Sequence, residues 1–333
     1  MRIGLAGTGR IGAFHAKTLA GLSHVDSLVV ADADARRATV VAESLGVEVV
    51  EHPDALFANG IDALVIAAAT DAHAQLIVSA VEAGVPTFCE KPVAPDVDGT
   101  LAVLDKVSGS DVPVHVGFQR RFDAGYVAAR RAVESGELGW VHTLRAGTLD
   151  PAPPPAEYIA HSGGFFRDCS VHDFDIVRWV TGREVTEVYA VGANRGEAFF
   201  GELGDIDAAS ALLTLDDGSF CHVAGTRYNA RGYDVRLEVL GSQDSIAVGL
   251  DQRLPLRSVE PGVSFPSGDP YPVFMDRFLD AYVAELTAFA DVARGTTPSP
   301  CTVADALEAF YVAEACEISR REHRPVPVDE VRR

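Results

Sequence analysis

An aspartate and a histidine four residues apart are the strongest candidates for proton chemistry in this sequence. Asp168 and His172 would share one face of a helix, because residues four apart are neighbours on a helix surface. Histidine suits proton transfer near neutral pH, and a nearby carboxylate can orient the ring and stabilise its cationic form. The alternative is structural, with Asp168 only capping a helix that ends near residue 181. Asp173 and Asp175 are predicted to be structural, because acids in the first turn favour the helix dipole.

A glycine-rich segment near the N-terminus matches the pattern G-x-G-x-x-G: Gly7, Thr8, Gly9, Arg10, Ile11 and Gly12. It follows a predicted strand and opens a predicted helix, the context in which the three glycines permit a tight turn, a bound pyrophosphate and close helix packing. Asp32 lies 20 residues further on, where a carboxylate accepts hydrogen bonds from the adenosine ribose. Its charge would repel a 2′-phosphate, so the pattern favours NAD, while Arg36 and Arg37 keep NADP as the less favoured alternative.

The segment CEKP places a lysine where a predicted parallel strand ends. Ligands of such sheets bind outside the carboxyl ends of the strands, so Glu90 and Lys91 are predicted beside the cofactor, as are Thr70 and His73 after an earlier strand. The chain has only three lysines among 28 basic residues, and the ammonium of Lys91 could stabilise alkoxide charge during hydride loss. The alternative is a surface lysine. For His73, packing near the nicotinamide or capping a helix is favoured over a role as base.

The elements that must position these residues alternate in the first third of the chain. Short apolar runs predict strands at residues 2–6, 27–31, 48–50, 63–69, 87–89 and 114–116. Helical patterns lie between them at residues 11–20, 36–45, 54–57, 73–83 and 97–107. This alternation predicts a doubly wound parallel sheet covered by helices on both faces, a Rossmann domain over residues 1–118.

From about residue 118 the pattern changes. Alternating runs predict antiparallel strands at residues 188–191, 210–215, 220–224 and 235–240, with a hairpin turn at residues 216–218. Helices are predicted at residues 170–181, 275–294 and 302–321. The sequence therefore predicts an α/β protein whose second domain, residues 119–333, is an α+β domain built on an open, mainly antiparallel sheet.

Composition narrows the partners. The 333 residues carry a net charge of −20, which repels nucleic acid and anionic membrane surfaces and least penalises a neutral ligand. The longest apolar run, residues 63–69, is too short to cross a bilayer, and glycines interrupt any signal-peptide core after Met1. Five scattered cysteines without CxxC spacing indicate reduced thiols in the cytoplasm, and no metal site is predicted.

Several separated motifs, in order along the whole chain, resemble the glucose–fructose oxidoreductase / inositol dehydrogenase / MocA (Gfo/Idh/MocA) family. They are GTGRIG, ATDAHA, EKP, GFQRRFD and SGGFFRDCSVHDFDIVRW. Within the family the chain is most similar to inositol 2-dehydrogenases, on the segments DPAPPPAEYI, RGYD and MDRFLDAYVAEL.

The resemblance implies an NAD-dependent dehydrogenase that oxidises a secondary hydroxyl of a neutral cyclitol or sugar, foremost myo-inositol to its 2-keto form. Its catalytic set would be Lys91, Asp168 and His172, with the histidine as base. Substrate contacts would also come from Arg120, Asp150 and Tyr233. Some inositol dehydrogenases have His and Asn where this chain has Thr148 and Asp150.

Family members associate through the open sheet, which implies a homodimer or homotetramer. The alternatives to an inositol dehydrogenase are a dehydrogenase of another sugar or polyol, an NAD-dependent glycosidase, and a non-catalytic NAD-binding regulator. The Lys–Asp–His set argues against the regulator.

Overall fold

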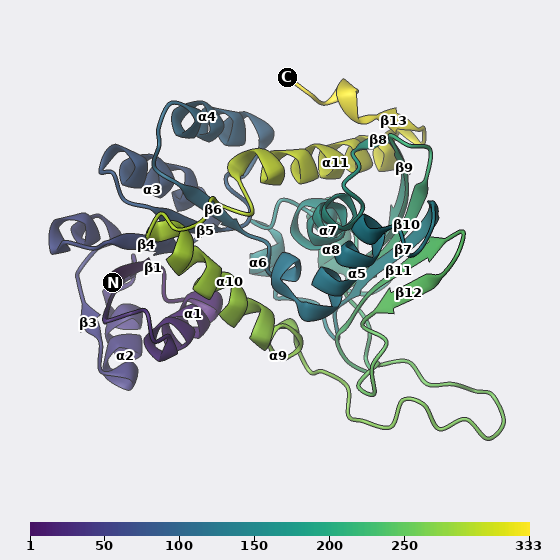
Figure 1. The fold of residues 1–333 in the computed structure, drawn as a ribbon, viewed down its shortest axis with the longest axis horizontal. Helices are drawn as coiled ribbons and strands as arrows, with labels where there is room; N and C mark the ends of the chain where they lie inside the picture. The colour runs from purple at the N-terminus through teal and green to yellow at the C-terminus, as the bar shows by residue number, and fades with distance from the viewer. The chain divides into compact units, whose positions relative to one another are not determined.

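In a computed structural model, described over all of residues 1–333, the chain forms two compact units (Figure 1). Unit 1 comprises Met1–Gln119 and Asp280–Leu307, and unit 2 comprises Arg120–Leu279 and Glu308–Arg333. Each unit is therefore assembled from two separate stretches of the chain. No helix in either unit is both long enough and apolar enough to cross a membrane.

Unit 1 is built on a six-stranded parallel sheet in the order β3-β2-β1-β4-β5-β6. This is the strand order of a dinucleotide-binding Rossmann fold, and it confirms the predicted parallel sheet. The strands are β1 (Arg2–Ala6), β2 (Ser27–Ala31), β3 (Glu48–Val49), β4 (Ala63–Ile66), β5 (Thr87–Glu90) and β6 (Val114–Gly117).

Helices cover both faces of this sheet, as Figure 1 shows: α1 and α2 lie on one face and α3 and α4 on the other. Their bounds are α1 (Arg10–Gly21), α2 (Ala35–Leu45), α3 (Thr70–Glu82) and α4 (Val97–Ser108), with the 3-10 helix η1 at Pro53–Asn59. The later helix α10 (Leu279–Ala293) adds Leu286 and Phe289 to the core. Phe289 packs on Phe88 of β5 with the ring centroids 5.7 Å apart.

The helix predicted over residues 275–294 is not continuous, so that prediction is wrong in its extent. A short helix α9 (Phe274–Arg277) ends before Phe278, and α10 begins after it. Phe278 leaves helical geometry, with φ −111° and ψ 18°, and its side chain is fully buried. Its ring lies 6.5 Å from that of Tyr233, so burial in the core of unit 2 accompanies the break.

Unit 2 is built on a seven-stranded sheet in the order β12-β11-β7-β10-β9-β8-β13. Strands β7 and β10 run parallel and the other neighbours are antiparallel, which confirms a mainly antiparallel sheet. The strands are β7 (Val141–Leu149), β8 (Val185–Ala193), β9 (Ala208–Leu215), β10 (Phe220–Thr226), β11 (Asp234–Gly241), β12 (Ser245–Val248) and β13 (Val326–Pro327). The predicted hairpin joins β9 to β10, whereas β7, an interior strand between β11 and β10, was not predicted.

Two helices of unit 2, α5 (Ala124–Ser135) and α7 (Val171–Thr181), pack together against one face of this sheet (Figure 1). The other helices are α6 (Ala156–Ile159), α8 (Ala198–Glu202) and α11 (Val303–Glu322), of which the residues from Glu308 onward belong to unit 2. Short 3-10 helices lie at η2 (Gln119–Phe122) and η4 (Val328–Glu330).

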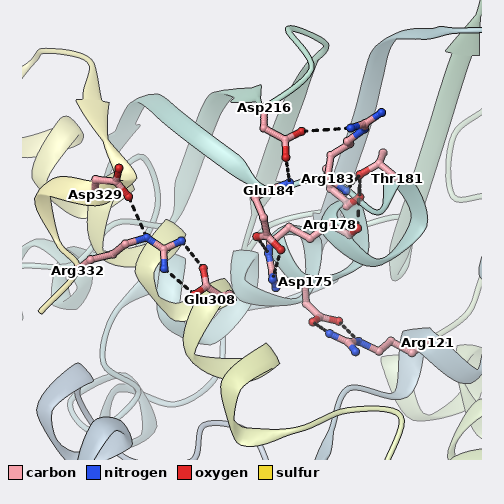
Figure 2. Close-up of polar contacts among 11 residues, drawn as sticks. Arg121, Asp175, Arg178, Thr181, Arg183, Glu184, Asp216, Glu308, Asp329 and Arg332 are labelled. Carbon is pink, nitrogen blue, oxygen red and sulfur yellow. Dashed lines mark hydrogen bonds and ion pairs between the residues drawn. The ribbon is translucent and has the colours of Figure 1, made fainter.

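Ion pairs anchor α7, as Figure 2 shows. Arg121 binds both oxygens of Asp175 at 3.0 and 2.5 Å, and Arg178 binds both oxygens of Glu184 at 2.6 and 2.8 Å. Arg332 in turn ties the C-terminal segment to Glu308 of α11, at 2.6 Å. The structural role predicted for Asp175 agrees with its burial and its arginine partner.

The other face of the sheet carries exposed apolar side chains. Tyr189 of β8 pairs with Leu212 of β9, and both are more than two-fifths exposed. Val191 and Phe220 are exposed to a similar extent on neighbouring strands. The open sheet therefore has one covered face and one apolar, solvent-facing surface.

Candidate functional site

The glycine loop of unit 1 has the geometry of an anion cradle. Gly7 has φ +97°, and a Cβ added there would lie 2.4 Å from the Ala68 nitrogen; at Gly12 it would lie 2.0 Å from the Gly7 oxygen. At Gly9, by contrast, a Cβ would meet no atom within 4 Å, so the backbone there is open to a ligand. Helix α1 follows with no side-chain cap and no acid in its first turn, which leaves its amides and its dipole to attract a phosphate.

Asp32 follows β2 directly and lies beside this loop, and its side chain is only 7% exposed. The Thr8 amide and hydroxyl donate to its Oδ2 at 2.6 and 2.9 Å, and the Asp34 amide donates to its Oδ1 at 2.9 Å. Burial raises the pKa of Asp32, but these hydrogen bonds and the Arg37 charge 3.7 Å away outweigh it, so the pKa is lowered. The carboxylate stays ionised beside the glycine loop, which fits the adenosine ribose of a dinucleotide.

Lys91 follows β5 on a turn that is held from both sides. Before it, Glu90 Oε1 lies 2.6 Å from Nε2 of His15, a fully buried residue of α1 that no sequence pattern singled out. After it, the Pro92 carbonyl oxygen lies 2.7 Å from Nδ1 of His73, whose Nε2 lies 3.1 Å from the Ala68 oxygen. Both ring nitrogens of His73 thus contact backbone oxygens, which is a packing role. Thr70 is the first residue of α3, the helix that carries His73.

Asp168 and His172 lie in one continuous helical segment of unit 2. Asp168 is in the π-helical turn η3 (Phe166–Ser170), and His172 is the second residue of α7, which continues from it. Asp168 does not cap α7: the N-cap is Ser170, without a side-chain hydrogen bond. π-Helical turns are rare and frequently occur at functional sites. Asp168 therefore does not fill the capping role that was its alternative.

The carboxylate of Asp168 is fixed through both oxygens. The Tyr158 hydroxyl on α6 donates to Oδ1 at 2.7 Å, and Arg227 Nη2 donates to Oδ2 at 2.6 Å. Arg227 Nη1 also donates to Asp150 Oδ2 at 2.8 Å. Arg227 and Tyr158 were absent from the predicted site. The structure thus brings Asp168 and Asp150 together around an arginine that sequence patterns did not reveal.

Arg120 belongs to a second buried network. Its Nη1 donates to Asp173 Oδ1 at 2.6 Å and its Nη2 to the Thr148 hydroxyl at 2.7 Å, while that hydroxyl donates to Asp173 Oδ2 at 2.8 Å. Burial lowers the pKa of Arg120, but the Asp173 charge outweighs this, so the pKa is raised and the guanidinium stays charged. Both terminal nitrogens of Arg120 bind protein oxygens, so a contact between Arg120 and substrate stays a prediction.

Tyr233 is also buried in unit 2. Its ring lies 6.2 Å from Phe274 and 6.5 Å from Phe278, and its amide donates to the Tyr271 carbonyl at 2.8 Å. Burial raises the pKa of Tyr233 well above its ordinary value, so its hydroxyl remains protonated and able to donate. The predicted site residues thus divide between the units: Lys91 and the glycine loop lie in unit 1, and Arg120, Asp150, Asp168, His172 and Tyr233 lie in unit 2.

Two family models match the chain. Residues 1–118 match the oxidoreductase family with an NAD-binding Rossmann fold, and residues 126–247 match the GFO/IDH/MocA C-terminal domain. A myo-inositol dehydrogenase of Streptomyces leeuwenhoekii is 39% identical, covering 96% of this chain and 97% of that protein. A scyllo-inositol 2-dehydrogenase (NAD(+)) of Bacillus subtilis is 37% identical over 99% of this chain and 96% of its own.

The fold is also similar to solved structures. A scyllo-inositol dehydrogenase from Lactobacillus casei, determined with bound NAD(H) and scyllo-inositol, superposes with a TM-score of 0.88 at 28% identity, covering 99% of each chain. The strand order, the open glycine loop and Asp32 in unit 1 agree with the NAD-binding domain that the family model describes. The chain therefore belongs to the GFO/IDH/MocA family of oxidoreductases, and it carries that family's NAD-binding Rossmann fold.

Proposed function

We propose that this protein is an NAD-dependent inositol 2-dehydrogenase that oxidises the 2-hydroxyl of myo-inositol to a ketone. The observation that carries the proposal is the helical pair of Asp168 and His172, with the carboxylate held by Tyr158 and Arg227. Relatives named as inositol dehydrogenases match the chain over nearly its full length, which supports this substrate class.

In the proposed reaction His172 accepts the hydroxyl proton, while Lys91 and Asp168 bind and polarise the reacting oxygen. Lys91 is partly buried on a turn fixed by His15 and His73, so its ammonium would be preorganised for developing alkoxide charge. When bound, NAD supplies the hydride acceptor, C4 of the nicotinamide. The hydroxyl would thus lose its proton to His172 and the carbon that bears it would lose a hydride to bound NAD, which would leave a ketone and NADH.

The remaining contacts divide between cofactor and substrate. NAD would be held by residues 7–12, Asp32, Thr70, Glu90 and Lys91, with His73 packed near the nicotinamide. The polyol would be held by Lys91, Arg120, Asp150, Asp168, His172 and Tyr233. A neutral polyol suits a chain with a net charge of −20, because it brings no charge into that field.

We further propose a division of labour in which residues 1–118 bind the cofactor and the domain from residue 119 onward binds substrate and forms the oligomer. The exposed apolar face of the unit 2 sheet supports a homodimer or homotetramer, since a patch of this kind marks an association surface. Light scattering should show more than one subunit, and Leu212→Glu should yield monomers. All five cysteines are buried and none is in a disulfide, which supports a cytoplasmic location.

An initial-rate screen tests the substrate and the cofactor together. Myo-inositol, scyllo-inositol, chiro-inositol and common aldoses are assayed with NAD and with NADP at neutral pH. The proposal expects the highest kcat/KM for myo-inositol with NAD. A higher kcat/KM for an aldose would reassign the substrate, and absence of NADH formation with every polyol would overturn the proposal.

A further inference from the structure

We infer that Arg227 is a positioning residue that clamps Asp150 and Asp168 together and neutralises one of their two charges. The inference rests on the proposed function, because it assigns a role within that proposed active site. It concerns side chains of unit 2 alone.

The clamp follows from the sheet. β7 and β10 are the parallel pair of the sheet, with Leu149 opposite Thr226, so the two strands end together at the same edge. The residues that follow, Asp150 and Arg227, are therefore neighbours although 77 positions separate them. The Asp150 amide donates to the Thr226 carbonyl at 2.9 Å, which extends the strand pairing to the base of the clamp.

The guanidinium of Arg227 is enclosed. Its side chain is 5% exposed, against 8% for Asp168 and 20% for Asp150. It lies 5.3 Å from the centre of the Phe165 ring, and the Arg227 amide donates to the Asp207 carbonyl at 2.8 Å. One nitrogen faces each carboxylate at 2.8 and 2.6 Å, a geometry that a planar fork provides and a lysine ammonium does not.

The clamp sets the charge around Asp168. The groups that face it or lie in its field are Arg227, Asp150, the Tyr158 hydroxyl, Cys169, Asp173 and Asp205, with His172 one turn along the helix. Burial raises the pKa of Cys169, which stays a neutral thiol. Without Arg227, two carboxylates in a buried region would lose the cation that binds them both. Loss of that positive charge favours the protonated form of every nearby group.

Charge and geometry can be separated by three variants. Arg227→Met removes both, Arg227→Lys keeps the charge but loses the fork, and Arg227→Met with Asp150→Asn removes one charge of each sign. The matched control is Arg145→Met on β7, whose side chain is 60% exposed and binds Glu238 at 3.0 Å on the sheet.

The assay is kcat/KM for the best polyol against pH, for wild type and all four variants. Arg227→Met should lower kcat/KM by about 10²-fold, as for a misplaced catalytic group. It should also move the acid limb of the profile upward by about 1 to 2 pH units. Arg227→Lys should lower kcat/KM but leave the acid limb at its wild-type pH. The double variant should return the acid limb toward its wild-type pH. Arg145→Met should match wild type.

Two results would overturn the role of Arg227 in neutralising one carboxylate charge. One is an acid limb that does not shift in Arg227→Met, and the other is an acid limb that does not return toward the wild-type pH in the double variant. A second readout does not depend on activity: urea unfolding midpoints for Arg227→Met, Asp150→Asn and the double variant. The clamp predicts that Asp150→Asn lowers the midpoint by less in the Arg227→Met background than in wild type. If the decreases in urea midpoint of the two single variants add up in the double variant, the clamp is overturned, whatever the substrate of the enzyme is. Failure of the clamp and failure of the proposed function are therefore distinguishable.

Discussion

Substitution of Asp32 by serine tests how one carboxylate both builds the glycine loop and selects the cofactor. The change removes a charge that accepts three hydrogen bonds, two of them from Thr8 within the loop. The matched control is Asp34→Ser. Asp34 is about half exposed and caps α2 by accepting from the Arg36 amide, a role that serine fills as well.

The size of the effect can be worked from these contacts. A hydrogen bond to a charged group contributes about 1.5–3 kcal/mol, and the shorter serine side chain cannot keep both bonds to Thr8. We therefore expect Asp32→Ser to lower the free energy of unfolding by about 3 kcal/mol. Loss of two ribose hydrogen bonds at about 1.5 kcal/mol each lowers kcat/KM for NAD by about 10²-fold. Since the carboxylate no longer repels the 2′-phosphate of NADP, the ratio of kcat/KM for NAD to kcat/KM for NADP should fall further.

The stability effect should depend on pH in one direction. The pKa of Asp32 is lowered in the folded chain, because the hydrogen bonds from Thr8 and Asp34 and the Arg37 charge outweigh the effect of burial. Its stabilisation is therefore complete above the unfolded pKa of about 3.9 and is lost as pH falls through the lower folded value. The gap in unfolding free energy between wild type and Asp32→Ser should narrow below about pH 4.

The assay pairs kcat/KM for NAD and NADP with urea unfolding at several pH values, for wild type and both serine variants. Asp34→Ser should retain wild-type stability and cofactor preference. The role assigned to Asp32 would be refuted if the ratio of kcat/KM for NAD to kcat/KM for NADP were unchanged in Asp32→Ser. It would also be refuted if that ratio changed as much in Asp34→Ser as in Asp32→Ser. If the difference in unfolding free energy between wild type and Asp32→Ser stayed constant down to pH 3, the stabilisation assigned to the charge of Asp32 would be refuted.

Three further outcomes are expected. Lys91→Arg should lower kcat by about 10²-fold in initial-rate assays, because the larger planar head misplaces the donor; turnover within threefold of wild type would show that any cation suffices. His172→Ala should nearly abolish turnover and remove the acid limb from residual activity while NAD affinity stays unchanged; an unchanged limb would exclude His172 as the titrating base. Phe289→Ala should lower the free energy of unfolding by about 3–5 kcal/mol, whereas Val283→Ala, 37% exposed on the same helix, should cost less than about 1 kcal/mol in the same denaturation experiment.

Most strands of unit 1 could be predicted closely because they are short apolar runs buried in a parallel sheet. The exceptions are β3 (Glu48–Val49), which is exposed, and β4, which ends at Ile66 and not at the predicted residue 69. The predicted bounds of β1 and β2 are those observed. Helix α3 begins at Thr70, three residues before its predicted start, because its first turn opens with the polar residues Thr70 and Asp71, which show no apolar period. Local pattern thus indicates an element better than it indicates its ends.

Elements that depend on distant contacts could not be predicted. β7 lies between β11 and β10, yet its sequence, VHTLRAGTL, alternates poorly because its burial comes from neighbours more than 70 residues away. The packing of α10 into unit 1 likewise depends on Phe88, some 200 positions earlier.

The candidate site divides in the same way. The glycine loop and Asp32 follow from a pattern with fixed spacing, and Asp168 and His172 follow from helical spacing. Arg227 and His15 had no such signal, since their partners lie 59 and 75 residues away in sequence. For Arg227 the missing information was the parallel pairing of β7 with β10, which only the tertiary fold supplies.

The most direct test of the central claim is the fate of the hydrogen on C2 of the polyol. Myo-inositol carrying deuterium at C2 is incubated with NAD and the enzyme, and the NADH is analysed by NMR and mass spectrometry. Direct hydride transfer predicts one deuterium at C4 of the nicotinamide in every NADH formed, together with a 2-keto product. Deuterium released to solvent, or no NADH formed from this substrate, would contradict the account.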